Sequence, residues 1–409
     1  MKTKVRSISL AMLAAIFIAA GAGSSFAQAG CDDTDAINAL DAKIRTNYPK
    51  VSTRKEAVNA GKEFLEKFGA CEATKEFTDW LKPLIPKWEE SVKAKEKGDV
   101  MAALFTKFDE GINNKKYDDV YSAGKEILVA EPKNVHVMIP LGIIALNESY
   151  NKNYKYNDDA LRYAKMAIDN LNAGAPPKMN KGQPVLNKAG QPAYSTWDFS
   201  KDEAIDELNY SMAYIYFYTK NDRKTALPIY YQLSQSKGRF KDEPRVFAAI
   251  GDYYVTEAAK LGTEIASMIE KQKAMATDEE KEKIDVDIKA KVGLFNGYTE
   301  RAIDAFTRAH KVAPTATAND KTYKDTLFKT ISDLYKRRFD KEAGMNEYMT
   351  ATLAKPFPNP TSEVTPINDP DPVTTSTTGS VPAAGAPNGN GAANTSTSTK
   401  PAAPVAKKP

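Results

Sequence analysis

The chain has 409 residues, enough for a string of helical modules, and 57 lysines and arginines against 53 aspartates and glutamates give it a formal net charge of +4. Three of the positive charges, Lys2, Lys4 and Arg6, lie at the N-terminus, which leaves the rest of the chain near +1. Nucleic-acid-binding domains usually carry a clustered basic excess, so this balance argues against a nucleic-acid partner.

Residues 1–29 have the pattern of a signal peptide. The charged start is followed by an apolar stretch over 8–22, and residues 27–29 (Ala-Gln-Ala) fit the small-x-small cleavage pattern. We therefore expect an exported protein, periplasmic or extracellular, with no transmembrane helix in the mature chain. Cys31 leaves a lipid-anchored protein, acylated on that cysteine and peripherally associated with the cell envelope, as an alternative. An uncleaved anchor is a second alternative.

Cys31 and Cys71 are the only cysteines, and export would permit a disulfide between them. Apolar spacing predicts helices over 32–47 and 52–68, with Ser52 as the N-cap of the second helix. In an antiparallel pair the start of the first helix lies beside the end of the second, which would bring the two cysteines together. Such a disulfide would contribute about 3–4 kcal/mol by loop-closure arithmetic. Two free thiols are the alternative.

The helical pattern continues over 72–97, where Pro83 and Pro86 predict a kink or a break. We interpret 30–97 as an N-terminal helical hairpin region. A short repeat connects this region to the rest of the chain, because Ala-Gly-Lys-Glu-Phe-Leu at 60–65 recurs as Ala-Gly-Lys-Glu-Ile-Leu 63 positions later. Both copies are expected in the middle of a helix, which indicates equivalent positions of diverged repeats.

The clearest helical pattern lies at 302–314. Ala302, Phe306 and Ala309 share one helix face, and Pro314 ends the helix. This spacing resembles the second helix of the tetratricopeptide repeat (TPR) family. Residues that match a first helix of that family are Phe247, Ile250, Gly251 and Tyr254. Weaker helix pairs are indicated by Leu141, Gly142 and Ala145 with Ala160, Ala164 and Ala167, and by Ala213 and Tyr216 with Ala226 and Tyr230.

The resemblance implies an all-α fold of antiparallel helix-hairpin repeats, a TPR-like α-solenoid, over 98–355. Two insertions interrupt it. A polar loop at 176–199 is expected to hold a small hairpin with a turn at 187–190, and 261–294 is expected to form a protruding helical hairpin. An unrelated helical bundle is the alternative fold. Over 356–409 Pro, Thr, Ser, Ala and Gly dominate, which predicts a disordered tail.

Residue patterns that carry chemistry are sparse. The two histidines, His136 and His310, form no His-Glu-x-x-His pair, and the sequence contains neither a Gly-x-Ser-x-Gly elbow nor a phosphate-binding loop. We therefore expect no catalytic site, no cofactor and no metal. An enzyme on an unrecognised helical fold remains the less favoured hypothesis.

The TPR resemblance implies a protein or peptide partner bound along a concave groove. The candidate partner-binding residues are His136, Tyr210, Tyr214, Tyr218, Arg245 and Asp252. The tyrosines come from an aromatic-rich stretch and offer contact area with a polar tip, although packing in the core is the alternative for each one. By family position, Arg245 and Asp252 would point to the concave side. We expect an exported binding scaffold, with a cell-envelope assembly or structural factor as the alternative.

Overall fold

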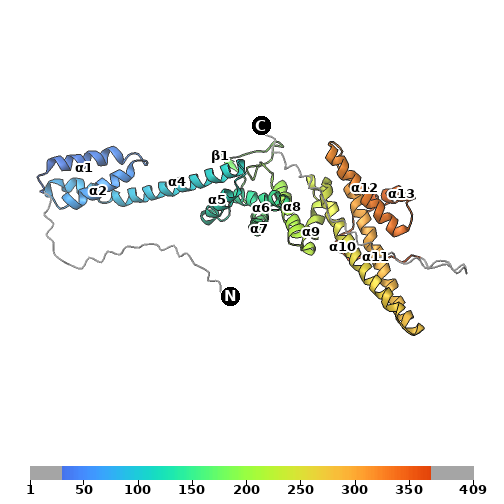
Figure 1. Cartoon of the computed structure of the whole chain (residues 1–409). Helices are drawn as coiled ribbons and strands as arrows, with labels where there is room; N and C mark the ends of the chain where they lie inside the picture. The colour runs from blue at the N-terminus through green and yellow to red at the C-terminus, as the bar shows by residue number, and fades with distance from the viewer. Residues whose placement is uncertain (1–29, 370–409) are drawn as a thin grey trace. The chain divides into compact units, whose positions relative to one another are not determined.

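The computed structural model describes residues 30–369, so the predicted signal peptide at 1–29 and the predicted tail from 370 onward lie outside the described residues. Contacts divide the chain between Ala103 and Leu104 into two units, each described here by itself (Figure 1). The described residues form thirteen α-helices and one very small sheet, as the sequence predicts for an all-α chain. None of these helices is long and apolar enough to cross a membrane.

Unit 1 is built from an antiparallel helix pair and the helices that follow it. Its elements are α1 (Thr34–Asn47), α2 (Arg54–Phe68), the 3-10 turn η1 (Glu72–Thr74), α3 (Lys75–Leu81) and the first part of α4 (Leu84–Asn113). The break between α3 and α4 falls at Pro83, as predicted, because proline cannot continue the hydrogen-bonding ladder. The expected N-cap is wrong: α2 begins after Thr53, not at Ser52, and Thr53 makes no side-chain capping bond.

The core of unit 1 explains the pairing of the two cysteines. Ile44 of α1 and Phe64 and Phe68 of α2 are almost fully buried against each other. This packing holds the start of α1 beside the end of α2, and the Cα atoms of Cys31 and Cys71 are 5.7 Å apart, with their sulfur atoms at disulfide distance. The predicted disulfide pairing is confirmed.

Unit 2 continues as a succession of helices in which each contacts the next. Its elements are the rest of α4, α5 (Tyr117–Ala130), α6 (Val135–Tyr150), α7 (Asn157–Asn172), α8 (Lys201–Tyr214), the π-helix η2 (Ile215–Thr219), α9 (Arg223–Ser234), η3 (Arg239–Asp242), α10 (Pro244–Lys273), α11 (Asp278–Val312), α12 (Ala318–Phe339) and α13 (Met345–Leu353). From α5 to α12 every helix contacts its successor in sequence, and α6 also contacts α8. The expected boundary at 97–98 lies inside α4, which runs without interruption through it.

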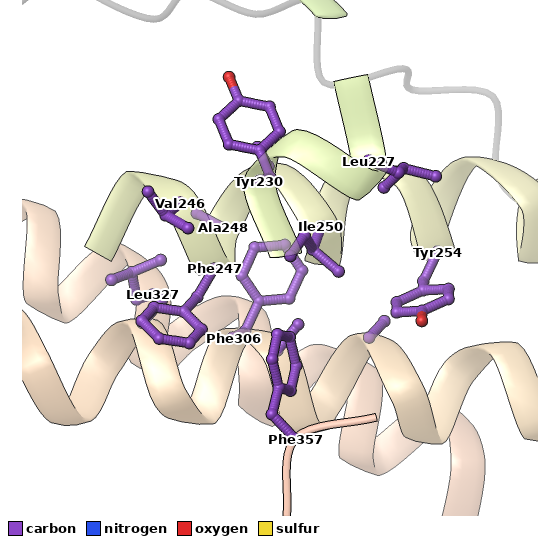
Figure 2. Close-up of a cluster of buried hydrophobic side chains, with 14 of the residues drawn as sticks. Leu227, Tyr230, Val246, Phe247, Ala248, Ile250, Tyr254, Phe306, Leu327 and Phe357 are labelled. Atoms are coloured by element: carbon purple, nitrogen blue, oxygen red, sulfur yellow. The ribbon is translucent and has the colours of Figure 1, made fainter. Parts of the chain in front are cut away.

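Helices α10 and α11, of 30 and 35 residues, form one antiparallel hairpin. Near its tip the Gln272 side chain bonds to the Lys281 carbonyl, and towards its base Phe306 lies against Gly251. A Cβ atom on Gly251 would lie 2.8 Å from the Phe306 ring, so the close contact of the two helices requires glycine there. Phe247, Ile250 and Phe306 belong to a cluster of buried hydrophobic side chains in unit 2, part of which Figure 2 shows. The expected helical hairpin at 261–294 is confirmed as an extension of both helices.

The polar loop at 176–199 contains two turns instead of the single one expected. Strands β1 (Met179–Asn180) and β2 (Gln183–Pro184) pair antiparallel around residues 181–182, which both have positive φ. The predicted turn at 187–190 is also present. The Asn187 side-chain oxygen accepts hydrogen bonds from two backbone N–H groups there.

The predicted start of a disordered tail at residue 356 is too early. Residues 356–369, which we call the C-terminal strap, lie against unit 2 without forming a helix or strand. Phe357 and Val364 are buried, and Asp369 is paired with Arg338 of α12. Composition misled the prediction because a few apolar anchors and several arginines from neighbouring helices are sufficient to order this segment.

Candidate functional site

Four of the six candidate residues meet in one part of unit 2, together with two tyrosines that sequence reasoning did not select. We call this group the tyrosine recess. It consists of Tyr150 from α6, Tyr214 from α8, Tyr218 from η2, Arg245 and Asp252 from α10, and Tyr323 from α12. Tyr218, Arg245 and Asp252 are exposed to solvent, and the other three side chains are half-buried.

Three of the tyrosine rings, those of Tyr150, Tyr214 and Tyr218, contact one another in sequence. The ring centroids of Tyr150 and Tyr214 are 4.8 Å apart in an edge-on arrangement, and those of Tyr214 and Tyr218 are also 4.8 Å apart. Edge-to-face contacts of this kind stabilise aromatic pairs. Tyr218 lies in a π-helical turn, in which the Lys220 N–H donates to the Ile215 carbonyl five residues earlier. Single π-helical turns often occur at functional sites.

Asp252 lies at the floor of the recess. The Tyr218 hydroxyl is close enough to its carboxylate to favour the charged form. Desolvation by the surrounding protein raises the pKa of Asp252 to about 6, against the opposing effects of Arg223 and Tyr218. Both Asp252 and Tyr218 nevertheless remain open to solvent, and Tyr218 is 48% exposed. The Asp252 side chain is thus accessible to solvent although protein is packed densely around it.

Arg245 is held at the edge of the recess by the start of α10. Glu243 caps this helix through a bond from the Arg245 N–H, and its carboxylate is 3.3 Å from the Arg245 guanidinium. The same guanidinium lies 6.0 Å from the centre of the Tyr323 ring, within range of a cation–π interaction. Burial raises the pKa of Tyr323 and raises the pKa of Tyr214 to about 12. Both hydroxyls are therefore protonated and able to donate hydrogen bonds at neutral pH.

Tyr210 does not belong to the exposed surface, which favours the alternative of a tyrosine packed in the core. It is only 5% exposed, and its ring stacks on Phe240 at 4.8 Å. Tyr210 lies one helical turn before Tyr214 on the same side of α8. The rings of Tyr230 and Phe240 bury Tyr210, whereas Tyr214 is half-buried.

His136 is also separate from the recess. It opens α6, which ends at Tyr150, so the two residues are roughly 21 Å apart along the helix axis. The His136 Nδ1 is 2.9 Å from the Tyr194 carbonyl, which can only accept, so Nδ1 carries the proton. Burial lowers the pKa of His136, which favours the neutral ring at neutral pH. His136 borders a cavity of about 420 Å³ with Pro132 and Pro176, and it anchors the loop at 176–199 to α6.

Sequence reasoning missed Tyr150 and Tyr323, and only Tyr150 has a sequence signal that could have identified it. Tyr150 is the last residue of an otherwise apolar helix and directly precedes a polar loop, a position from which a side chain often reaches the surface. Tyr323 lies in a polar stretch of α12 without a recognisable pattern. Only the packing of α12 brings Tyr323 to within range of Arg245.

Comparison with known proteins adds no further assignment. No protein-family model, curated protein or solved structure matches this chain. Within residues 30–369, no group of three or more His, Cys, Asp or Glu side chains is placed to hold a metal ion. The function of the recess therefore has to be inferred from its own geometry and chemistry.

Proposed function

We propose that this protein is an exported helical scaffold that binds a protein or peptide partner in the tyrosine recess and is not an enzyme. The observation that carries the proposal is the convergence of tyrosines and two charged residues from four helices into one solvent-open site. Tyrosine rings supply contact area and a polar tip at low entropic cost. Arg245 and Asp252 offer one charge of each sign, which suits a polypeptide with its own mixed charges.

We also propose that helices α5 to α13 form a TPR-like solenoid. Residues at the matched small positions lie at close helix contacts: a Cβ atom on Gly142 would be 2.5 Å from Leu208, and Ala302 is fully buried. The family places partner contacts on the first helix of each pair. In this chain the recess residues come from α6, α8, α10 and α12, or from the turn that directly follows α8, which supports that reading.

Export is supported by the pairing of Cys31 with Cys71, because disulfides persist in oxidising compartments. A sulfur atom in a disulfide is not available for lipid attachment, which favours the soluble form over the lipid anchor. Mass spectrometry of the mature N-terminus tests this: we expect a chain that begins at Gly30, after cleavage at Ala29. A chain that begins with a lipid-modified Cys31 would overturn the soluble reading.

Partner binding is tested by site-specific photo-crosslinking in the cells that produce the protein. A photo-reactive phenylalanine analogue at position 218 is expected to yield a discrete protein or peptide adduct, identified by mass spectrometry. The matched control carries the analogue at position 286, since Val286 on α11 is 64% exposed and lies outside the recess.

The substitution Asp252→Lys in the chain that carries the analogue at 218 tests whether the recess itself selects the partner. We expect the adduct to disappear, because the substitution reverses the charge at the floor of the recess. The proposal is wrong if the adducts at 218 and 286 are the same, or if the adduct at 218 is unaffected by the charge reversal.

A further inference from the structure

The C-terminal strap is held by a seat of helical side chains that contact mainly its backbone. The guanidinium of Arg301 on α11 donates to the carbonyl oxygens of Glu363 at 2.7 Å and Ser362 at 3.2 Å. Further along α11, the Arg308 guanidinium donates to the Lys355 carbonyl at 2.7 Å, just before the strap begins. Contacts to carbonyl groups are available to almost any sequence, so this part of the seat recognises an extended backbone.

A second part of the seat forms hydrogen bonds with both the backbone N–H and the backbone carbonyl of Ile367. The Ile367 N–H donates to the Gly293 carbonyl at 2.8 Å, and the Asn296 side-chain amide donates to the Ile367 carbonyl at 3.1 Å. Gly293 and Gly297 leave the room that the strap uses. A Cβ atom on Gly297 would lie 2.4 Å from the Thr365 carbonyl oxygen. This paired recognition of one residue's N–H and C=O fixes the register of an extended segment.

Three side-chain features of the strap supply selectivity. Phe357 is buried near Phe247 (Figure 2), with their ring centroids 5.4 Å apart. The Arg308 guanidinium lies 5.0 Å from the centre of the Phe357 ring. Val364 is buried seven residues later. Asp369 forms a two-bond ion pair with Arg338, at 2.9 Å for each bond. The Arg338 side chain is only 3% exposed and would be a buried cation with fewer partners if Asp369 left.

The geometry points to an extended-peptide binding site on α10, α11 and α12 that the chain's own strap occupies in cis. The ligand class is a partner segment with an aromatic anchor, an aliphatic anchor seven residues later and a carboxylate five residues after that. The site is separate from the tyrosine recess and does not depend on the function proposed for it.

The strap is suited to exchange with such a segment. Most of its residues remain exposed, and it forms neither a helix nor a strand, so its release breaks no regular secondary structure. Its attachment to α13 keeps its effective concentration at the seat high, and a competing segment must overcome that advantage. Strap residues 360–364 also form one wall of a cavity of about 590 Å³ opposite Tyr253 and Tyr298, and exchange would open this wall.

The test uses the full chain with a specific protease site inserted between Lys355 and Pro356, which are both exposed. A fluorescent synthetic peptide of residues 356–369 is titrated against uncut and cut protein, and binding is followed by fluorescence anisotropy. We expect saturable binding to the cut protein and at least tenfold weaker binding to the uncut protein, because the attached strap competes in cis.

Matched variants show whether the peptide uses the seat. Arg338→Ala is expected to weaken binding of the peptide to the cut protein at least tenfold, whereas Arg337→Ala, at the exposed neighbouring position, should leave it unchanged. Circular dichroism is recorded before and after cleavage. Equal binding to cut and uncut protein, equal effects of the two variants, or loss of helical signal on cleavage would each overturn the proposal, the last because the strap would then be an integral part of the fold.

Discussion

The Tyr218 hydroxyl and the Asp252 carboxylate interact electrostatically, and this interaction links the π-helical turn after α8 to the first half of α10. The carboxylate remains open to solvent although the surrounding protein desolvates it. The two residues therefore mark a point at which two helix pairs of unit 2 meet.

The raised pKa of Asp252 predicts a specific pH dependence of stability. Its folded-state pKa is about 6, whereas an aspartate in an unfolded chain titrates near 3.9. Between these values the folded state holds a proton that the unfolded state has lost, so the free energy of unfolding falls as pH rises from about 4 to 6. We expect Asp252→Asn to remove this part of the dependence, as measured by urea unfolding at several pH values.

Other buried acids, including Asp206 and Asp304, also have raised pKa values, so only the difference from wild type is diagnostic. The control is Asp287→Asn, at an exposed position of α11, which should leave the pH profile parallel to that of wild type. A parallel profile for Asp252→Asn would contradict the desolvated environment assigned to Asp252.

Substitution of two tyrosines four positions apart on the chain should lower the free energy of unfolding by different amounts. Tyr210→Ala removes a ring buried at 5% exposure and should cost about 3–5 kcal/mol of unfolding free energy. Tyr214, one turn later on the same helix, is half-buried, and Tyr214→Ala should cost only about 1 kcal/mol while abolishing the crosslink at position 218. Chemical denaturation followed by circular dichroism measures the first effect. A larger stability loss for Tyr214→Ala would show that the recess is part of the core.

The α10–α11 contact predicts opposite effects for two glycines of one helix. Gly251→Ala places a methyl group 2.8 Å from Phe306 and should destabilise the protein by about 1–3 kcal/mol. Gly262→Ala is the control, because its Cβ atom would meet only Phe295 at 3.6 Å, an ordinary contact. We expect Gly262→Ala to stabilise the protein by about 0.5–1 kcal/mol, since alanine suits a helix interior better than glycine. Thermal unfolding of both variants checks the sign of each change.

The Cys31–Cys71 pair should stabilise unit 1 through its 40-residue separation. Replacing both cysteines by alanine is expected to lower the stability of this unit by about 3–4 kcal/mol. Trp80 and Trp88 lie in unit 1 and report its unfolding by fluorescence. If both cysteines of the purified wild-type protein react with an alkylating reagent without a reductant, the pairing itself is refuted.

Much of the helical framework was predictable because its signals are local. The 3.6-residue spacing of Ala302, Phe306 and Ala309 places three buried residues on one helix face, and Pro83 marks a real break. The pairing of Cys31 with Cys71 followed from one helix hairpin of short connection. The strap was missed because the two arginines that hold it are distant in sequence. Arg301 contacts the strap backbone, and Arg338 contacts the Asp369 side-chain carboxylate.

The sequence by itself determined the all-helical class, the hairpin at α10–α11 and two of the four tyrosines of the recess, because periodicity and helix-breaking residues act over a few positions. Only the tertiary structure decided which tyrosines face the recess and which pack in the core. Tyr210 and Tyr214 differ by about one helical turn, and the burial of each depends on the helices packed around it. The ordering of residues 356–369 was decided in the same way, by side chains that only the folded chain brings together.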